Sequence, residues 1–155
     1  MKSRMISSAS ILLWAGLVLG ISFIEAPLKF RAPDVTTEIG LGIGRLVFTA
    51  MNRMEWVFAI PILVCLALDR ASLRTWIFVG VPFVFLILQT FVLLPPLHDR
   101  TDRLLAGETL EPSNRHIFYI VTEAIKFLAL LVAGFHLLKG LALHQPPSFQ
   151  RSKNS

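Results

Sequence analysis

Residues 116–127 read HIFYIVTEAIKF, a stretch in which polar and charged side chains interrupt apolar sequence. It begins an apolar run long enough for a membrane-spanning helix, yet it carries His116, Tyr119, Glu123 and Lys126. Spacings of 3, 4 and 3 residues place these four side chains on one face of an α-helix. Because charges inside a bilayer are costly, such side chains usually face a partner or a wet cavity. The rest of the chain should therefore supply the partners of this polar face.

The composition is that of a membrane protein. Of the 155 residues, 54% are hydrophobic and 16% are charged, with a mean hydropathy of +0.66, whereas soluble domains average about 25% charged residues. The net charge of +5 does not indicate nucleic-acid binding, because the basic residues flank apolar runs and form no cluster. Cys65 is the only cysteine in the sequence, which excludes an intramolecular disulfide or a thiolate metal cluster. The expected partner is the lipid bilayer.

Four apolar segments predict the fold class, an all-α four-helix transmembrane bundle. The predicted helices are Met5–Ile24, a helix from Gly42 to Leu68, Thr75–Leu94 and His116–Leu143. A helix of about 20 residues rises about 30 Å, the thickness of one hydrocarbon core. We expect a single domain over residues 1–143, followed by a disordered cytoplasmic tail over residues 144–155.

Prolines set the predicted helix ends. Pro27 and Pro33 predict a polar loop over residues 25–41, in which Asp34 or Thr36 caps the second helix. Pro95 and Pro96 predict the end of the third helix, followed by a long polar loop over residues 97–115.

The charge distribution predicts the orientation of the bundle. Residues 1–10, the turn over 69–74 and the segment from Lys139 lie on the same side and carry an excess of basic residues. Short basic segments next to membrane-spanning helices stay in the cytoplasm. We therefore expect both termini to be cytoplasmic, in a cell membrane such as the bacterial inner membrane.

A polar layer crosses the predicted bundle at one depth. At 1.5 Å per residue, positions on three helices lie about 20–24 Å from the cytoplasmic helix ends; they are Asn52, Glu55, Gln89, Glu123 and Lys126. We expect an ion pair between Glu55 and Lys126, with Glu123 paired either to Lys126 or to Arg45. Glu25, His98 and His116 are expected to ring the layer from the outer side. The candidate binding residues are Glu25, Arg45, Asn52, Glu55, Gln89, His116, Tyr119, Glu123 and Lys126.

The layer has two interpretations. It is either a buried network that fixes the register of the helices, or the wall of an outer cavity built from Glu55, Gln89, Glu123 and Lys126. Such a cavity would bind, or help to move, a cation, a small polar solute or a lipid. A homo-oligomer or a larger membrane complex, in which the chain is an accessory subunit, stays open.

No cofactor is predicted, but a metal- or haem-dependent enzyme or redox subunit is the alternative. Glu55, Glu123, His116 and His98 are the candidate metal ligands, since they supply oxygen and nitrogen donors. The sequence contains no HxxxH, HxxE or ExxH pair. A haem held by two histidines would need His98 and His116.

The sequence also resembles a family of small membrane proteins of unknown function that includes transmembrane protein 205. The resemblance is carried by Trp14-x-Gly16, Ala26-Pro27-x-x-Phe30, Gly40 and Gly44 leading to Arg45-x-x-Phe48, Glu55, Pro95 with Arg100, and His116. It implies a four-helix integral membrane protein with no assigned enzymatic activity, in a family one of whose members is linked to drug resistance and vesicle traffic. The pairs Glu25/Lys29 and Glu123/Lys126 fall outside these motifs.

Overall fold

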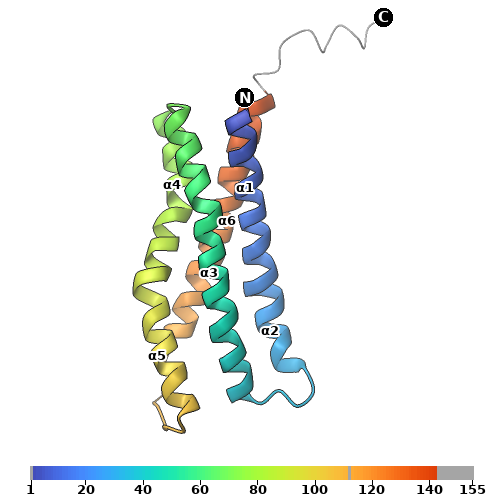
Figure 1. Cartoon of the computed structure of the whole chain (residues 1–155), viewed down its shortest axis with the longest axis vertical. Helices are drawn as coiled ribbons and strands as arrows, with labels where there is room; N and C mark the ends of the chain where they lie inside the picture. The colour runs from blue at the N-terminus through green and yellow to red at the C-terminus, as the bar shows by residue number, and fades with distance from the viewer. Residues whose placement is uncertain (1, 112, 143–155) are drawn as a thin grey trace, which may run out of the picture.

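The chain folds into an all-α four-helix bundle, as predicted (Figure 1). The computed structural model describes residues 2–111 and 113–142, so the predicted tail over 144–155 lies outside the described residues. Each of the four long helices is called a rod below, because two of them contain more than one kind of helical turn.

The first rod contains α1 (Lys2–Val18), the π-helix η1 (Leu19–Glu25), α2 (Ala26–Leu28) and the 3-10 helix η2 (Lys29–Arg31). The second rod is α3 (Thr37–Leu68). The third contains α4 (Leu73–Leu88), the π-helix η3 (Gln89–Leu93) and α5 (Leu94–Leu105), and the fourth is α6 (Arg115–Ala142).

All four rods are long and apolar enough to cross a membrane. The candidate spans are Ser3–Arg31, Thr37–Leu68, Leu73–Leu105 and Arg115–Gly140, with 26 to 33 residues each. Large apolar side chains point outward, among them Leu46, Leu68 and Leu73, which are 71–77% exposed. A protein surrounded by water rarely exposes so much contiguous apolar surface, whereas a bilayer covers it.

Three of the prolines predicted to break helices, Pro27, Pro95 and Pro96, instead follow wide turns inside two rods, whereas Pro33 lies outside the helices as predicted. Pro27 is the second residue after η1, and Pro95 is the second residue after η3. A proline lacks the N–H that would bond to the carbonyl four residues earlier, and its ring crowds that carbonyl. The π turns bond one residue further back: Ala26 N–H donates to Ile21 O, and Leu94 N–H donates to Gln89 O. The helical path therefore continues, and the predicted ends at Pro27 and at Pro95-Pro96 were wrong.

The connections that follow the first and the third rod are therefore shorter than the predicted loops over 25–41 and 97–115. The first rod continues to Arg31 and the third to Leu105, which leaves residues 32–36 and, in the described part of the chain, 106–111 and 113–114 outside the helices. The second helix begins at Thr37, five residues before the expected start at Gly42. Thr36 is its cap, as one of the two predicted candidates, because its Oγ1 accepts a hydrogen bond from Ile39 N–H at 3.3 Å.

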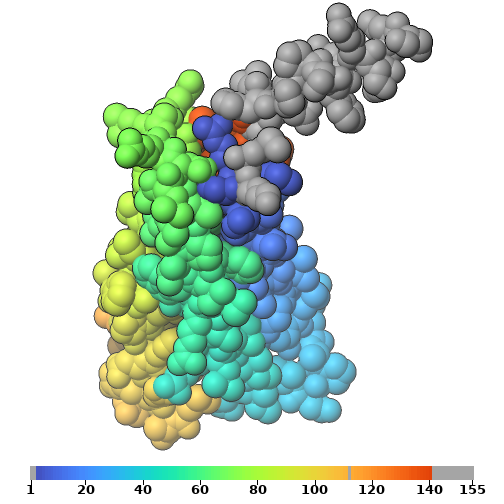
Figure 2. Space-filling model, turned by 45° about the horizontal axis from the view of Figure 1, so that its top comes forward, coloured from blue at the N-terminus to red at the C-terminus, as the bar shows by residue number. Residues whose placement is uncertain are grey.

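Different segments of the chain lie at the two ends of the bundle, which are called the α3–α4 end and the loop end below. The α3–α4 end holds the start of α1, the turn over residues 69–72 and the end of α6 (Figure 1). The loop end holds the connections after Arg31 and after Leu105. Figure 2 shows the same arrangement in a space-filling view, with the start of α1 beside the α3–α4 turn.

The apolar core fills the bundle toward the α3–α4 end. α1 packs against α3 and α6, and α4 packs against α6. Trp14 lies at the centre, with its ring edge-on to Phe83 at a centroid distance of 5.5 Å. The other buried members of the core are Ile11, Ala15, Val18, Ala59, Ile62, Leu66, Val79, Leu86, Leu130, Ala133 and Leu137.

Gly134 lies where α6 packs closely against α1. A Cβ atom at Gly134 would lie 3.0 Å from Leu12 Cδ2 and 3.4 Å from Ile11 Cγ2, whereas one at Gly16 would meet nothing within 4 Å. Gly134→Val should destabilise the bundle by about 1–3 kcal/mol through overpacking. Gly16→Val is the matched control and should change the unfolding temperature in detergent much less. Equal effects of the two substitutions would show that α1 and α6 do not pack as described.

Candidate functional site

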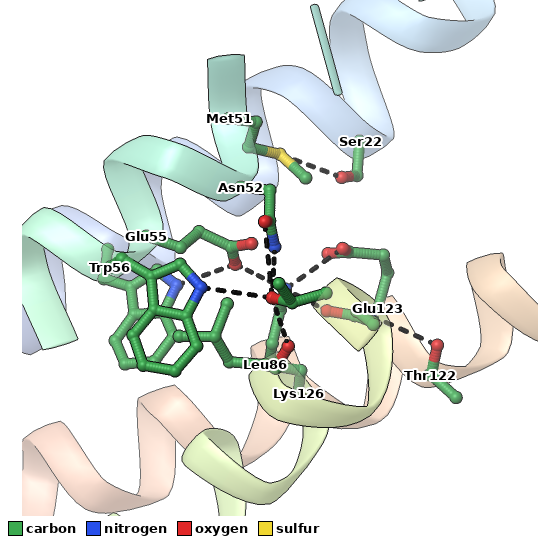
Figure 3. Close-up of polar contacts among 12 residues, drawn as sticks. Ser22, Met51, Asn52, Glu55, Trp56, Leu86, Thr122, Glu123 and Lys126 are labelled. Carbon is green, nitrogen blue, oxygen red and sulfur yellow. Dashed lines mark hydrogen bonds and ion pairs between the residues drawn. The ribbon is translucent and has the colours of Figure 1, made fainter. Parts of the chain in front are cut away.

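A charged network lies inside the bundle, where Lys126 of α6 is held between two carboxylates (Figure 3). Lys126 Nζ forms an ion pair with Glu55 Oε1 of α3 and a second one, at 3.0 Å, with Glu123 Oε1 of its own helix. It also donates a hydrogen bond to Gln89 Oε1 of η3. The four side chains are 0–1% exposed. The predicted pair Glu55–Lys126 is therefore confirmed, as is the pairing of Glu123 with Lys126.

Neighbouring side chains hold the carboxylate and the amide in place. Trp14 Nε1 of α1 donates a hydrogen bond to Glu55 Oε1 at 2.8 Å. Gln89 Nε2 donates to Thr122 Oγ1 at 3.2 Å. All four rods therefore contribute a side chain to the network. Trp14 and Thr122 were missed as partners by the sequence analysis, because only a contact between helices shows that they belong to the polar layer.

A second polar cluster lies beside the network and joins α3 to the third rod. Asn52 Nδ2 donates to Thr90 Oγ1 at 2.9 Å, and Trp56 Nε1 donates to the same oxygen at 3.1 Å (Figure 3). The Thr90 hydroxyl also donates to the carbonyl of Leu86 at 2.8 Å. Asn52 thus lies in the predicted layer, but its hydrogen-bond partner is Thr90, which was not predicted from the sequence.

The network contains one ammonium group and two carboxyl groups. Glu55 and Glu123 each use Oε1 for Lys126, and the Oε2 atom of each is buried with no hydrogen-bond partner among the described residues. If both carboxyl groups are ionised, the triad carries one uncompensated negative charge. A buried charge of this kind is costly unless a proton or a bound cation neutralises it.

A cavity of about 460 Å³ lies at the loop end and reaches this network at Glu123. Its wall is mostly apolar and includes Phe23, Phe30, Phe48, Leu94, Leu97 and Ile120. Of the four residues predicted to build an outer cavity, Glu123 is the one in its lining. Glu55, Gln89 and Lys126 are fully buried and lie outside that lining. Lys126 contacts Glu123, and Glu55 and Gln89 contact Lys126, so these three residues support Glu123 from behind the wall.

Three unpartnered polar atoms belong to residues on this cavity. They are Glu123 Oε2, the hydroxyl of Tyr119 and Nε2 of His98. Tyr119 faces the Glu123 carboxylate without a hydrogen bond of 3.5 Å or less, and its ring lies edge-on to Phe48 at 5.4 Å. His116 also lines the cavity. His116, Tyr119 and Glu123 of α6 are thus all lining residues of this hollow.

Two of the three Lys and Arg side chains in the cavity lining, Lys29 and Arg45, have acidic partners. Lys29 Nζ lies 3.5 Å from Glu25 Oε2 and 5.1 Å from the centre of the Phe48 ring. Arg45 forms an ion pair with Asp102 at 2.6 Å. The alternative pairing of Glu123 with Arg45 was therefore wrong, because α5, which was predicted as a loop, brings Asp102 to Arg45.

The candidate metal ligands are divided between two places. Glu55 and Glu123 share Lys126, so a metal ion at this pair would have to displace the ammonium group. His98 and His116 line the cavity. Within residues 2–111 and 113–142, no three His, Cys, Asp or Glu side chains converge. A metal or haem at these residues stays a prediction.

Comparison with known proteins adds no constraint, since no protein-family model, no curated protein and no solved structure matches this chain. The resemblance to the family of transmembrane protein 205 stays a prediction from its short motifs. Functional inference therefore depends on the geometry of the buried network and the cavity.

Removal of Lys126 should unfold the bundle more readily. Lys126→Met leaves Glu55 and Glu123 buried without their shared partner, and breaking a buried pair costs about 3–5 kcal/mol. The measurement is the unfolding temperature in detergent. The control is Arg103→Met, which breaks the exposed pair with Glu108 and should cost at most about 1 kcal/mol.

A compensated variant separates the lost charge balance from the lost packing. Lys126→Met combined with Glu55→Gln and Glu123→Gln removes all three charges and should recover most of the lost stability. If Lys126→Met alone unfolded at the temperature of the unchanged protein, the ion pairs would not hold the bundle together.

Proposed function

We propose that the protein is a multi-pass membrane protein that binds a small amphipathic molecule with a cationic head, such as an amine, in the loop-end cavity. One observation carries this proposal. Three of the buried polar atoms that lack a partner, on Glu123, Tyr119 and His98, belong to residues that line the same cavity. Buried polar groups are nearly always hydrogen-bonded, so such a group of unpaired atoms fits a ligand's polar end.

The size and lining of the cavity suit an amphipathic ligand. A volume of about 460 Å³ falls within the range of small-molecule sites, which are mostly apolar with a few polar groups that orient the ligand. The rings of Phe23, Phe30 and Phe48 would contact the apolar body of the ligand. Glu123 and Tyr119 would receive its head.

The charge of the network favours a cation as that head. Lys126 neutralises one of the two carboxyl groups that it contacts, and Glu123 Oε2 is left to neutralise a second positive charge. Lys29 and Arg45 at the cavity have acidic partners, Glu25 and Asp102, so they do not offer an unpaired site for an anion. Arg100, the third basic residue in the lining, donates to the carbonyl oxygen of Glu111. Lys126, Gln89 and Trp14 act in this proposal by positioning the carboxylates.

Binding of three matched probes tests the charge preference. Octylamine, octanoate and octanol share one apolar chain and differ in the charge of the head. We expect octylamine to bind the purified protein about 10- to 100-fold more tightly than the other two, as a charge-assisted hydrogen bond contributes about 1.5–3 kcal/mol. Isothermal titration calorimetry below the micelle concentration of the probes gives the affinities.

Substitution of Glu123 should remove this preference. Glu123→Gln should bring octylamine to the affinity of octanol, and Tyr119→Phe should weaken it by a smaller factor. Glu108→Gln, which changes an exposed carboxylate outside the cavity lining, is the control and should have no effect. Equal binding of the three probes, or a preference for octanoate, would refute the cationic head.

We further propose that the cavity opens to the outer side of a cell membrane, with the α3–α4 end in the cytoplasm. The proposal is supported by the basic residues near that end, Arg4, Arg70, Arg74 and Lys139. In a Cys65→Ser background, a membrane-impermeant maleimide added to intact cells should label Ser113→Cys and leave Leu73→Cys unlabelled. The reverse pattern would contradict the orientation and not the binding site.

A further inference from the structure

A second cavity, of about 680 Å³, lies at the α3–α4 end and is lined by four cationic side chains. Arg4 comes from α1, Arg70 from the turn, Arg74 from the start of α4 and Lys139 from the end of α6. We call it the basic cavity. Segments from all parts of the chain thus bring positive charge to one hollow, on the opposite end of the bundle from the proposed amine site.

The positive charge of the basic cavity is not balanced within the described part of the chain. Among its lining residues there, Asp69 supplies the one carboxylate, and its Oδ2 accepts a hydrogen bond from Ser3 Oγ at 2.6 Å. No ion pair joins Arg4, Arg70, Arg74 or Lys139 to a described carboxylate. Residues 141–155 contain Arg151 and Lys153 and no Asp or Glu, so their side chains supply no negative charge.

Arg70 occupies a backbone position that normally carries glycine. Its φ of 46° is in the left-handed region, which disfavours residues with a side chain. Arg70 N–H donates to Ala67 O at 3.2 Å and Ala71 N–H donates to Leu66 O at 3.0 Å, the pattern that ends a helix with a left-handed residue. Glycine would form this turn with less strain, so helix termination does not account for the arginine. Its side chain does line the basic cavity.

The start of α4 adds further anion-binding groups. Ser72 caps this 16-residue helix, and Ser72, Arg74 and Thr75 line the basic cavity. A helix N-terminus carries partial positive charge and is a favourable place for a phosphate group. Thr75 Oγ1 lies 3.3 Å from His136 Nε2, and both residues are in the lining. Hydroxyl, imidazole and guanidinium groups together match the oxygens of a phosphate.

The wall of the basic cavity also reaches the apolar outer surface of the bundle. Val132 and Phe135 of α6 line it and are 51% and 60% exposed. A lipid would place its phosphate among the cations and its acyl chains along Val132 and Phe135. A free phosphate ion has no apolar part that would contact these two side chains. Basic pockets between membrane helices on the cytoplasmic side are known lipid-headgroup sites.

We propose that the basic cavity binds the phosphate group of an anionic membrane lipid. Arg70 and Arg74 contact the phosphate together with Arg4 and Lys139, and the acyl chains lie against Val132 and Phe135. The site is independent of the proposed amine site, since it shares no lining residue with that cavity.

Lipid binding to the full chain in detergent, followed by native mass spectrometry, tests the proposal. The probes are phosphatidylglycerol and phosphatidylcholine with identical acyl chains. Phosphatidylglycerol should bind at least about fivefold more tightly, and combined Arg4→Gln, Arg74→Gln and Lys139→Gln should weaken it on the order of a hundredfold, at about fivefold per basic residue. Equal affinity for the two lipids would overturn the proposal.

Substitutions at Arg70 distinguish binding from folding. Arg70→Gly should keep or raise the unfolding temperature, because the turn is relieved, while phosphatidylglycerol affinity falls by about fivefold. Arg70→Lys should retain most of the affinity. Asp69→Asn should increase it by a similar factor. Unchanged phosphatidylglycerol affinity in Arg70→Gly would show that Arg70 does not contact the phosphate, which contradicts the proposal.

Two controls address charge in general and the source of the phosphate. Removal of two basic residues at the loop end, Arg103→Gln with Arg115→Gln, should leave lipid affinity unchanged, and an equal loss there would show that total charge, not the cavity, attracts the lipid. Inorganic phosphate at millimolar concentration should not displace phosphatidylglycerol. Displacement by inorganic phosphate would overturn the assignment to a lipid.

Discussion

The ammonium group of Lys126, enclosed between Glu55 and Glu123, is the interaction on which the arrangement of the four rods depends. Apolar packing in a bilayer distinguishes poorly between helix registers, because lipid tails are as apolar as the helix surfaces. A buried charge permits far fewer arrangements, since each alternative leaves it unpaired. With Trp14 on Glu55 and Gln89 on Lys126, one charged centre sets the height and rotation of every rod.

The two cavities lie on either side of this centre and differ in charge. The loop-end cavity reaches the carboxyl group of Glu123, whereas the basic cavity is rich in guanidinium and ammonium groups. Trp14 and Leu130 belong to the buried apolar core of the bundle. The π-helix η3 serves this arrangement directly, because Gln89 bonds to Lys126 while the adjacent Thr90 bonds to Asn52. Two neighbouring residues of one wide turn thereby join two polar clusters.

The sequence predicts the bundle and the central pair, because both follow from simple physical limits. Apolar length defines the spans, and a constant rise per residue places Glu55 and Lys126 at one depth. The partners Trp14, Thr90 and Thr122 could not be found in this way, since they depend on helix rotation. The ends at Pro27 and Pro95 were misplaced because a π turn accommodates a proline without ending the helix. α5 then brings Asp102 to Arg45, which the predicted loop could not show.

The position of the charged centre also bears on how the chain enters a membrane. Glu55 lies in the second span and Lys126 in the fourth, and ribosomes deliver spans in order. During synthesis the carboxyl group of Glu55 therefore reaches the bilayer before its cationic partner exists, at a cost of about 2.5–3.5 kcal/mol for a charged group. The second span has the lowest hydropathy of the four, at 1.5. A three-span intermediate, in which Glu55 lacks Lys126, therefore precedes the complete bundle during synthesis.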